Sequence, residues 1–94
     1  MIINDLIWLP NVVDKLSWKH GVRTSEVEEI FAGSFKVRKA EKGIRKNEDV
    51  YYAYGQTDSG RYLTVIFVYK INKNALILSA REMTQKERIA YVRK

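Results

Sequence analysis

The side chains that could carry chemistry in this 94-residue chain form a limited set: one histidine, His20, seventeen lysines and arginines, and six tyrosines. The chain has no cysteine, which excludes disulfides, thiolate metal sites and cysteine nucleophiles. A zinc site normally needs several histidine, cysteine or carboxylate ligands, and a single histidine argues against one. The sequence also has no glycine-rich phosphate loop and no nucleophile elbow. We therefore expect neither a metal nor a cofactor.

These side chains are sufficient for one reaction, the cleavage of RNA. A ribonuclease need not supply a nucleophile, because the RNA 2′-hydroxyl can attack the adjacent phosphate. The protein must then align the reacting groups, stabilise charge on the phosphate and move protons. Arginine matches two phosphate oxygens with its planar guanidinium, and neutral histidine takes up a proton at about pH 7. Tyrosine stacks on bases or donates a hydrogen bond.

Charge and hydropathy indicate which kind of partner and which cell compartment to expect. Seventeen basic against eleven acidic side chains give a net charge of +6, which favours a polyanionic partner, although the same charge would also serve solubility. No apolar run approaches the ~20 residues that span a bilayer, and the N-terminus lacks the pattern of a secretory signal. We expect a single domain over residues 1–94, located in the cytoplasm.

Two helices are expected in the first third of the chain. The segment Ile2–Leu9 could form a short strand, and Pro10 then suits the first turn of a helix that ends before Gly21. The apolar side of this helix is formed by Val12, Val13, Leu16 and His20. Ser25 and Glu28 have the spacing of a capping box, which predicts a second helix with Ser25 as its N-cap.

The middle of the chain has the pattern of a β-sheet. Phe35 and Val37 alternate with charged residues and predict an edge strand, followed by a polar loop over residues 39–49. Three further strands are expected: Val50–Thr57, Arg61–Ile71 and Ala75–Arg81. Turns of two or three residues join them, so neighbouring strands must be antiparallel. Thr84 and Glu87 repeat the capping-box spacing and open a C-terminal helix.

The predicted fold class is α+β: a small antiparallel sheet with two N-terminal helices and one C-terminal helix packed on it, all on one face. The apolar side of the C-terminal helix is formed by Ile89, Tyr91 and Val92. In the longest strand, the face expected to meet the helices carries Leu63, Val65, Phe67, Tyr69 and Ile71. The mixed face, typical of a partly exposed, ligand-facing surface, carries Tyr62, Thr64, Ile66, Val68 and Lys70.

Several short motifs occur in an order that resembles a known protein family. They are Trp8, Lys19–Val22, Glu28–Phe31, Asp58–Arg61, Leu78–Thr84, Glu87–Arg88 and Tyr91. In their order and spacing, over nearly the whole chain, the sequence resembles the BrnT toxins of bacterial type II toxin–antitoxin systems. The last strand departs from the pattern Arg-Ile-Ile-Ser-Ala-Arg that the family often has there. Leu76 takes the place of the first arginine, while Arg81 keeps the second.

The resemblance implies a RelE-like fold and metal-independent cleavage of RNA, with messenger RNA as the expected substrate, which inhibits translation. It implies a DNA-binding antitoxin as partner, usually of ribbon-helix-helix type, that covers the toxin in a hetero-oligomer and represses the shared operon. Arg81 would hold the scissile phosphate, and Tyr91 would help to position the RNA. His20, with Lys19, would serve proton transfer or charge stabilisation. Further RNA-binding residues would be Arg61, Lys70, Glu87 and Arg88.

The residues with proposed roles also have structural interpretations. His20 would interact with the dipole of the helix that it ends or pack under the sheet, and Lys19 would be solvated. Arg81 would form an ion pair with Glu82 or Glu87. Glu87 would serve the capping box first and act as a general base second.

The remaining candidate residues also have both a functional and a structural interpretation. Arg61 and Arg88 would be surface charges, and Tyr91 would belong to helix packing. Three neighbouring tyrosines are interpreted as strand packing rather than as a platform for bases: Tyr51, Tyr52 and Tyr54. Six basic residues form either a solvated loop or an electrostatic landing surface for RNA or for an acidic antitoxin tail: Lys36, Arg38, Lys39, Lys42, Arg45 and Lys46.

Leu76 leaves open a second function, of another class. A leucine cannot bind phosphate, so the chain would then be a non-catalytic module that binds an antitoxin or RNA and has lost cleavage. Alternatively, Lys70, Arg61 or Lys73 replaces the missing cation. A DNA-binding regulator is a third hypothesis, without a recognition-helix pattern in its support.

Overall fold

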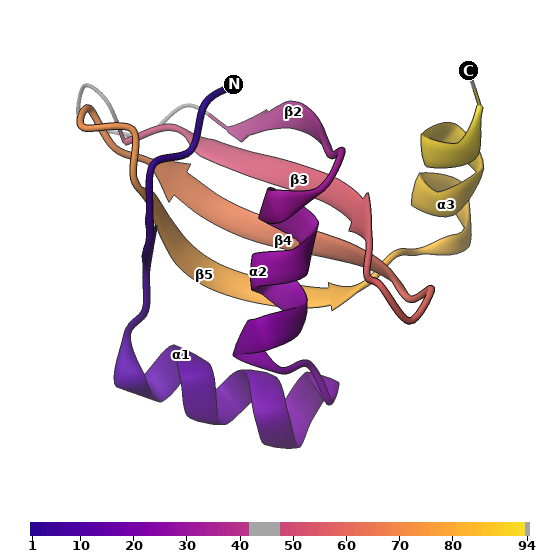
Figure 1. Ribbon diagram of the computed structural model, residues 1–94, viewed down its shortest axis with the longest axis horizontal. Helices are drawn as coiled ribbons and strands as arrows, with labels where there is room; N and C mark the ends of the chain where they lie inside the picture. Colours follow the sequence, from indigo (N-terminus) through magenta and orange to yellow (C-terminus); the bar gives the residue numbers. More distant parts are fainter. Residues whose placement is uncertain (42–47, 94) are drawn as a thin grey trace.

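The computed structural model describes residues 1–41 and 48–93, which form one sheet and the helices around it (Figure 1). Its elements in chain order are β1 (Leu6–Ile7), α1 (Pro10–Lys15), η1 (Leu16–His20), α2 (Thr24–Ala32), β2 (Lys36–Glu41), β3 (Val50–Gln56), β4 (Tyr62–Tyr69), β5 (Ala75–Glu82) and α3 (Gln85–Val92). The predicted α+β class is confirmed. The segment η1 continues α1 as a π-helix, and Gly21 ends it in the left-handed conformation with φ of 61°.

The sheet has the strand order β1-β5-β4-β3-β2. The consecutive strands β3, β4 and β5 are antiparallel, as the short turns between them require. The short opening strand exists as β1, but it is parallel to β5, with Leu6 opposite Ala75. The sheet is therefore mostly antiparallel, with β1 at one edge and β2 at the other.

The edge strand β2 is longer than the sequence predicts. Lys39, expected in a polar loop, is paired with Tyr51 in the ladder, and its ammonium group lies 2.8 Å from the carboxylate of Asp49. This ladder and the ion pair extend the strand to Glu41. Of the predicted basic loop, Lys42, Arg45 and Lys46 lie outside the described residues.

The start of α2 differs from the prediction by two residues. Arg23 is the N-cap, so Ser25 lies within the first turn and the prediction of Ser25 as N-cap is wrong. The carboxylate of Glu26, rather than Glu28, accepts the backbone N–H of Arg23 at 3.0 Å. Glu26 is also bound by the guanidinium of Arg61, a tertiary contact that the local spacing does not contain.

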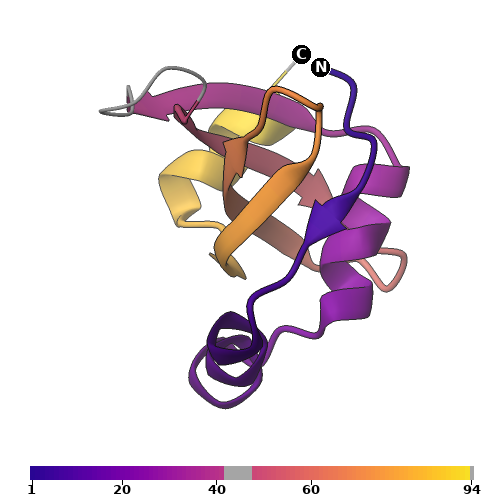
Figure 2. The same ribbon diagram turned by 90° about the vertical axis from the view of Figure 1, so that its left-hand side faces the viewer.

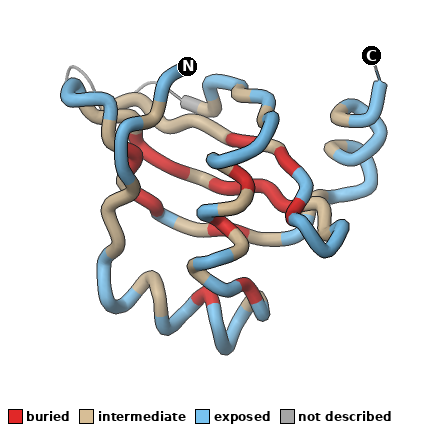
Figure 3. The backbone as a smooth tube through the Cα atoms, in the orientation of Figure 1, coloured by how far each residue is buried: buried red, intermediate tan, exposed pale blue. Residues whose placement is uncertain are grey.

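One face of the sheet packs against α2 and holds the hydrophobic core (Figure 3); we call it the helix face. The buried cluster includes Leu63, Val65 and Phe67 of β4 with Val27 and Ile30 of α2. Each fully buried side chain of this kind contributes roughly 1.5–3 kcal/mol to stability. The approach of α2 is close at Gly55, where a Cβ atom would lie 2.8 Å from Ile30 Cγ2. This contact accounts for a glycine within β3.

The prediction that Ile71 lies on the helix face is wrong. Strand β4 ends at Tyr69, and Ile71 lies in the following turn with 80% of its surface exposed. The turn is closed by a 2.9 Å hydrogen bond from the Lys73 N–H to the Lys70 carbonyl, with Lys73 at a φ of 69°. The apolar alternation in the sequence therefore continues beyond the strand itself.

The C-terminal helix α3 lies on the opposite face of the sheet, which we call the open face (Figure 2). The prediction that all helices lie on one face is therefore wrong for α3, which lies on the face opposite α2. Its capping box is confirmed: the Glu87 N–H donates to Thr84 Oγ1 at 3.1 Å, and the Thr84 N–H donates to Glu87 Oε1 at 2.9 Å. Ile89 and Val92 are 49% and 53% exposed, so this helix is not attached by an apolar core.

Candidate functional site

Strand pairing gathers basic and aromatic side chains on the open face. One row across four strands contains Arg81, Thr64, Tyr54 and Lys36. The next row contains Ser79, Ile66, Tyr52 and Arg38. Because successive residues of a strand point to opposite faces, these side chains share the face away from α2. The mixed face predicted from β4 is therefore the surface on which the candidate site is built.

Arg81 is held by Glu87 in a bidentate ion pair. Its Nη1 donates to Glu87 Oε1 at 2.6 Å, and its Nη2 donates to Oε2 at 3.0 Å. The hydroxyl of Thr64, a fully buried residue, donates to the same Oε1 at 3.0 Å. Of the two ion pairs considered for Arg81, the one with Glu87 forms, and the contact with Glu82 is to its backbone carbonyl at 3.2 Å.

This ion pair fixes the charge of both partners. The hydrogen bond from Arg81, opposed by burial and assisted by donors from Thr84 and Thr64, lowers the pKa of Glu87 to about 2. The same hydrogen bond raises the pKa of Arg81. Glu87 is thus ionised near neutral pH and is a weak proton acceptor there. These properties disfavour the interpretation of Glu87 as a general base.

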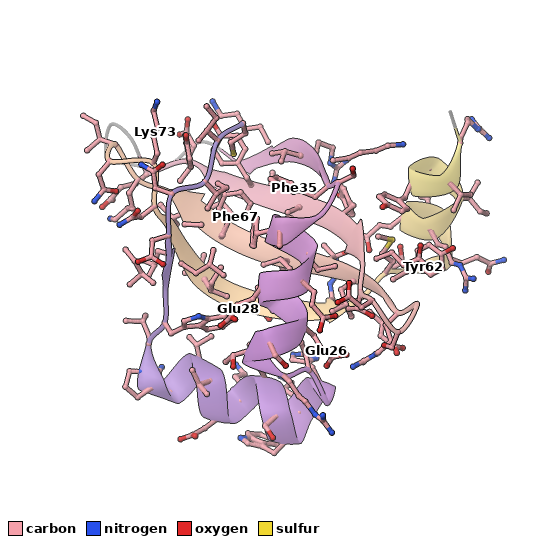
Figure 4. All side chains as sticks on the ribbon, in the orientation of Figure 1. Glu26, Glu28, Phe35, Tyr62, Phe67 and Lys73 are labelled. Atoms are coloured by element: carbon pink, nitrogen blue, oxygen red, sulfur yellow. The ribbon has the colours of Figure 1, made fainter. Side chains whose placement is uncertain are left out.

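Aromatic and cationic side chains join α3 to the sheet beside this pair. The ring of Tyr62, which lies beside α3 (Figure 4), meets the ring of Tyr91 edge-on with centroids 6.0 Å apart. The guanidinium of Arg88 lies 4.2 Å from the Tyr62 ring centroid. Lys36 Nζ donates to the Tyr91 carbonyl at 2.7 Å and lies 5.2 Å from the Tyr91 ring centroid. Polar and cation–π contacts, rather than apolar burial, therefore attach α3.

A groove of about 440 Å³ lies between α3 and the strands β2 and β3. Its lining includes three cations and two tyrosines: Lys36, Arg38, Lys86, Tyr54 and Tyr91. Glu87 also lines the groove, and Arg81 is bound to it. Three cations in one groove can bind the phosphates of a nucleic acid, and tyrosine rings can stack on its unpaired bases.

The structure does not bring Lys19 and His20 to this groove. Both lie at the end of η1, with Lys19 exposed and His20 half-buried. Within residues 1–41 and 48–93, no hydrogen bond or ion pair joins either side chain to Arg81 or Tyr91. Their predicted roles stay predictions.

Arg61 and Lys70 lie in ion pairs of their own. Arg61 Nη1 donates to both carboxylate oxygens of Glu26 at 2.9 Å and to the Gly21 carbonyl at 3.0 Å. Burial opposes the change, but hydrogen bonds from the Arg23 backbone and Arg61 lower the pKa of Glu26. Lys70 follows the far end of β4, and its ammonium group lies 3.4 Å from the carboxylate of Glu48.

The three neighbouring tyrosines divide between the two faces. Tyr51 stacks on Phe67, with ring centroids 5.8 Å apart, and packs against the core as predicted. Tyr52 and Tyr54 lie on the open face, where the Arg38 guanidinium is 5.5 Å from the Tyr52 ring centroid. From the sequence, Thr64 was placed on the ligand-facing mixed face without a specific role, and Tyr52 and Tyr54 were interpreted as strand packing rather than as a platform for bases. The alternation along each strand was available as a signal, but the row that Thr64 and Tyr54 share, and the neighbouring row of Tyr52, depend on the register between strands.

Leu76, where the family often has arginine, also lies on the open face. It is opposite Val68, which is opposite Val50, so it belongs to an apolar row. Val68 is four residues from Thr64 along β4, which separates this row from Arg81 by roughly 13 Å at ~3.3 Å per residue. Position 76 is therefore not a neighbour of the Arg81–Glu87 pair.

Two general properties concern the described part of the chain. Among residues 1–41 and 48–93, no group of three or more histidine, cysteine, aspartate or glutamate side chains is arranged to hold a metal ion. In the same residues, no helix is both long enough and apolar enough to span a membrane.

Comparison with known families matches most of the chain to one group of proteins. The family model described as the ribonuclease toxin BrnT of type II toxin–antitoxin systems matches residues 8–87, which include Arg81, Glu87 and the whole sheet from β2 to β5. A comparison with individually curated proteins finds no significant match. A match over most of the chain is sufficient to show the family. The chain therefore belongs to the BrnT ribonuclease toxin family of type II toxin–antitoxin systems.

Proposed function

We propose that the open face binds RNA and that Arg81 holds the scissile phosphate while the RNA 2′-hydroxyl attacks it. The observation that carries this proposal is the ion pair of Arg81 with Glu87, a residue that lines a groove together with cations and tyrosines. Preorganised cations of this kind stabilise the charge that develops on a phosphate during transfer. In this proposal cleavage needs no metal, because the substrate supplies the nucleophile.

The donors of Arg81 support the assignment. Of its five N–H groups, Nη1 uses two, on Glu87 Oε1 and the Glu82 carbonyl, and Nη2 uses one, on Glu87 Oε2. Within the described residues this leaves Nε–H and the second N–H of Nη2. These two lie on one edge of the guanidinium, which has the spacing to bind two phosphate oxygens.

The other candidate residues have unequal support. Tyr91 positions the RNA, a role supported by its ring on the groove wall, and Arg88 binds RNA from the exposed side of Tyr62. His20 and Lys19 serve proton transfer or charge stabilisation, supported by their sequence motif alone. Arg61 and Lys70 contact RNA only if their ion pairs open.

A ribonuclease toxin of a type II toxin–antitoxin system has RNA as its substrate and a cognate antitoxin as its partner. In our proposal the RNA is messenger RNA, and its cleavage in the cytoplasm inhibits translation. The antitoxin is a DNA-binding protein of ribbon-helix-helix type that forms a hetero-oligomer with the toxin and blocks cleavage. The groove cations Lys36, Arg38 and Lys86 offer complementary charge to an acidic antitoxin segment.

A second candidate function is a module that binds RNA or antitoxin without cleavage. The observation that favours it is the apolar row of Leu76, Val68 and Val50, where the family often has an arginine. A chain that lacks a required phosphate ligand would still present the basic groove for binding.

Expression in a bacterium that lacks the protein separates the two functions. Cleavage predicts growth arrest with degraded total RNA, both lost in Arg81→Ala. Arg23→Ala is the matched control, because it removes an exposed arginine that does not line the groove. Growth arrest by a folded Arg81→Ala protein contradicts the assignment of the site. Normal growth with soluble wild-type protein supports the module without cleavage.

A further inference from the structure

We propose that Glu87 is a positioning residue for Arg81, with Thr64 fixing the orientation of the Glu87 carboxylate. This inference rests on the proposed function, because it assigns a role within the same site. It differs from the prediction that Glu87 binds RNA, since a carboxylate repels phosphate. Glu87 acts here on the arginine and not on the substrate.

The first argument is that the Glu87 carboxylate is held by donors from three directions. It accepts four hydrogen bonds: two from Arg81, one from the Thr64 hydroxyl and one from the Thr84 backbone N–H. Three of these bonds fall on Oε1, which leaves that oxygen no lone pair for a substrate hydroxyl or a water, and the fourth falls on Oε2. The donors come from β5, β4 and the start of α3, which fixes the carboxylate relative to the sheet.

The second argument is the edge of Arg81 that Glu87 occupies. Glu87 binds the end of the guanidinium formed by Nη1 and Nη2, and the Glu82 carbonyl binds the outer N–H of Nη1. Within the described residues, the edge formed by Nε and Nη2 is left for phosphate. Glu87 therefore determines which edge faces the substrate and prevents the side chain from rotating.

The third argument is the burial of Thr64. Thr64 is one of two buried polar residues among those described, and it lies directly opposite Arg81 in the β4–β5 ladder. Valine has nearly the same shape and higher preference for a central strand, so packing alone does not require a hydroxyl here. The hydroxyl donates to Glu87 Oε1, the oxygen that also binds Arg81 Nη1. The Thr64 hydroxyl therefore connects the Glu87 carboxylate to β4 and restrains its orientation.

Glu87 also caps α3, and the test must separate the two roles. Glu87→Gln keeps the side-chain oxygen that a capping box needs, since glutamine serves that position as well. It removes the negative charge and one of the two acceptors for Arg81. Thr84→Ala does the reverse: it removes the hydroxyl that caps Glu87 N–H and keeps the Thr84 backbone N–H and the ion pair.

The experiment measures kcat and KM for cleavage of a fluorogenic single-stranded RNA by the purified full chain, with the thermal midpoint of each variant. We expect Glu87→Gln to lower kcat by about tenfold to hundredfold, because small displacements of a positioning contact have effects of this size. Thr64→Val lowers kcat several-fold, and Thr64→Ser restores it. Thr84→Ala lowers the thermal midpoint and leaves kcat within about twofold.

Two results overturn the inference. One is a kcat for Glu87→Gln and Thr64→Val equal to that of the wild type. The other is an equal loss of kcat in Thr84→Ala and Glu87→Gln, which would show that only the cap matters. The proposed function is judged separately by Arg81→Ala: if that variant cleaves at the wild-type rate, the site assignment itself fails. If Arg81→Ala is inactive while Glu87→Gln is unimpaired, only the positioning role is lost.

Discussion

Two arginine–glutamate pairs in this molecule, Arg61–Glu26 and Arg81–Glu87, share one local plan. In both, the glutamate accepts a backbone N–H at the start of a helix: that of Arg23 for Glu26, at 3.0 Å, and that of Thr84 for Glu87, at 2.9 Å. In both, the arginine comes from a strand end or hairpin and donates to both carboxylate oxygens. The two pairs differ in what surrounds them.

The surroundings of Arg61 are mostly acidic. Besides Glu26, its guanidinium binds the Gly21 carbonyl and, through Nη2, the carboxylate of Glu82 at 3.3 Å. The nearby pocket also contains Glu29 and Asp58, which would repel phosphate. Glu26 is at the side of α2 (Figure 4), so this pair connects α2 to the β3–β4 hairpin.

The surroundings of Arg81 are basic. Its row on the sheet ends in Lys36, and the groove beside it is lined by Arg38 and Lys86 as well. The same pair of residue types is thus a structural clamp in one place and a candidate phosphate site in the other. Neighbouring charge, rather than the pair itself, makes the difference.

The largest expected effect is that of Arg81→Ala on cleavage. We expect the rate to fall roughly hundredfold or more, a size typical for loss of one preorganised donor to the reacting group. Arg81→Lys should recover little of the rate, because an ammonium group cannot bind two phosphate oxygens through one planar edge. Initial cleavage rates on single-stranded RNA measure both variants. A rate for Arg81→Lys near that of the wild type would contradict bidentate binding.

The next effect is that of Arg61→Ala on stability. Removing Arg61 leaves Glu26 partly buried without its partner, and we expect a loss of about 1–2 kcal/mol, reduced by the partial exposure of the pair. The melting temperature should fall by roughly 4–8 °C for each kcal/mol lost in a domain of this size. Calorimetry measures this change. An unchanged melting temperature together with weaker RNA binding would instead support the predicted role of Arg61 in binding RNA.

A smaller effect is the dependence of stability on pH. The pKa of Glu87 is lowered from 4.5 to about 2, and that of Glu26 is lowered as well. A carboxyl group with a lowered pKa stabilises the fold above its unfolded pKa, and this contribution is lost as pH falls through the folded pKa. The melting temperature should therefore decrease between about pH 4.5 and about pH 2, and decrease less in Glu87→Gln. Melting curves across this range test it, and identical pH profiles would contradict the strength of the ion pair.

The smallest expected effect is that of Leu76→Arg. Because its row lies two rows from Arg81, we expect the cleavage rate to change by less than about threefold. The melting temperature should change little, since Leu76 is only half-buried. A rise of tenfold or more would show that the site has lost a cation, and would favour the module without cleavage for the wild type.

Local patterns predicted the elements whose stabilising contacts are also local. The capping box of Thr84 and Glu87 is an example, since its two hydrogen bonds span three residues. The same spacing predicted the wrong start for α2. The glutamate that accepts the N-cap N–H is Glu26, which also binds Arg61, thirty-five residues away along the chain. Sequence also could not show that α3 lies on the open face. Its apolar pattern suggested core packing, but polar contacts from Lys36 and Glu87 attach it.

The sequence predicted some of the residues of the candidate site but not how they are arranged in space. Arg81 and Tyr91 were identified from motifs; Tyr91 lines the groove, and Arg81 is bound to Glu87, which also lines it. The row of Arg81, Thr64, Tyr54 and Lys36 depends on register across four strands, which no local pattern specifies. Lys19 and His20 do not belong to that row, and only their sequence motif supports their predicted catalytic roles.

The two similar arginine–glutamate pairs differ in role, and one pair of measurements distinguishes them. Cleavage rate and melting temperature are determined for Arg81→Ala and Arg61→Ala on the same RNA. We expect both variants to lose melting temperature, because each leaves a partly buried glutamate without its partner, but only Arg81→Ala to lose the cleavage rate. Equal losses of rate in both variants, or full cleavage by a folded Arg81→Ala protein, would contradict it.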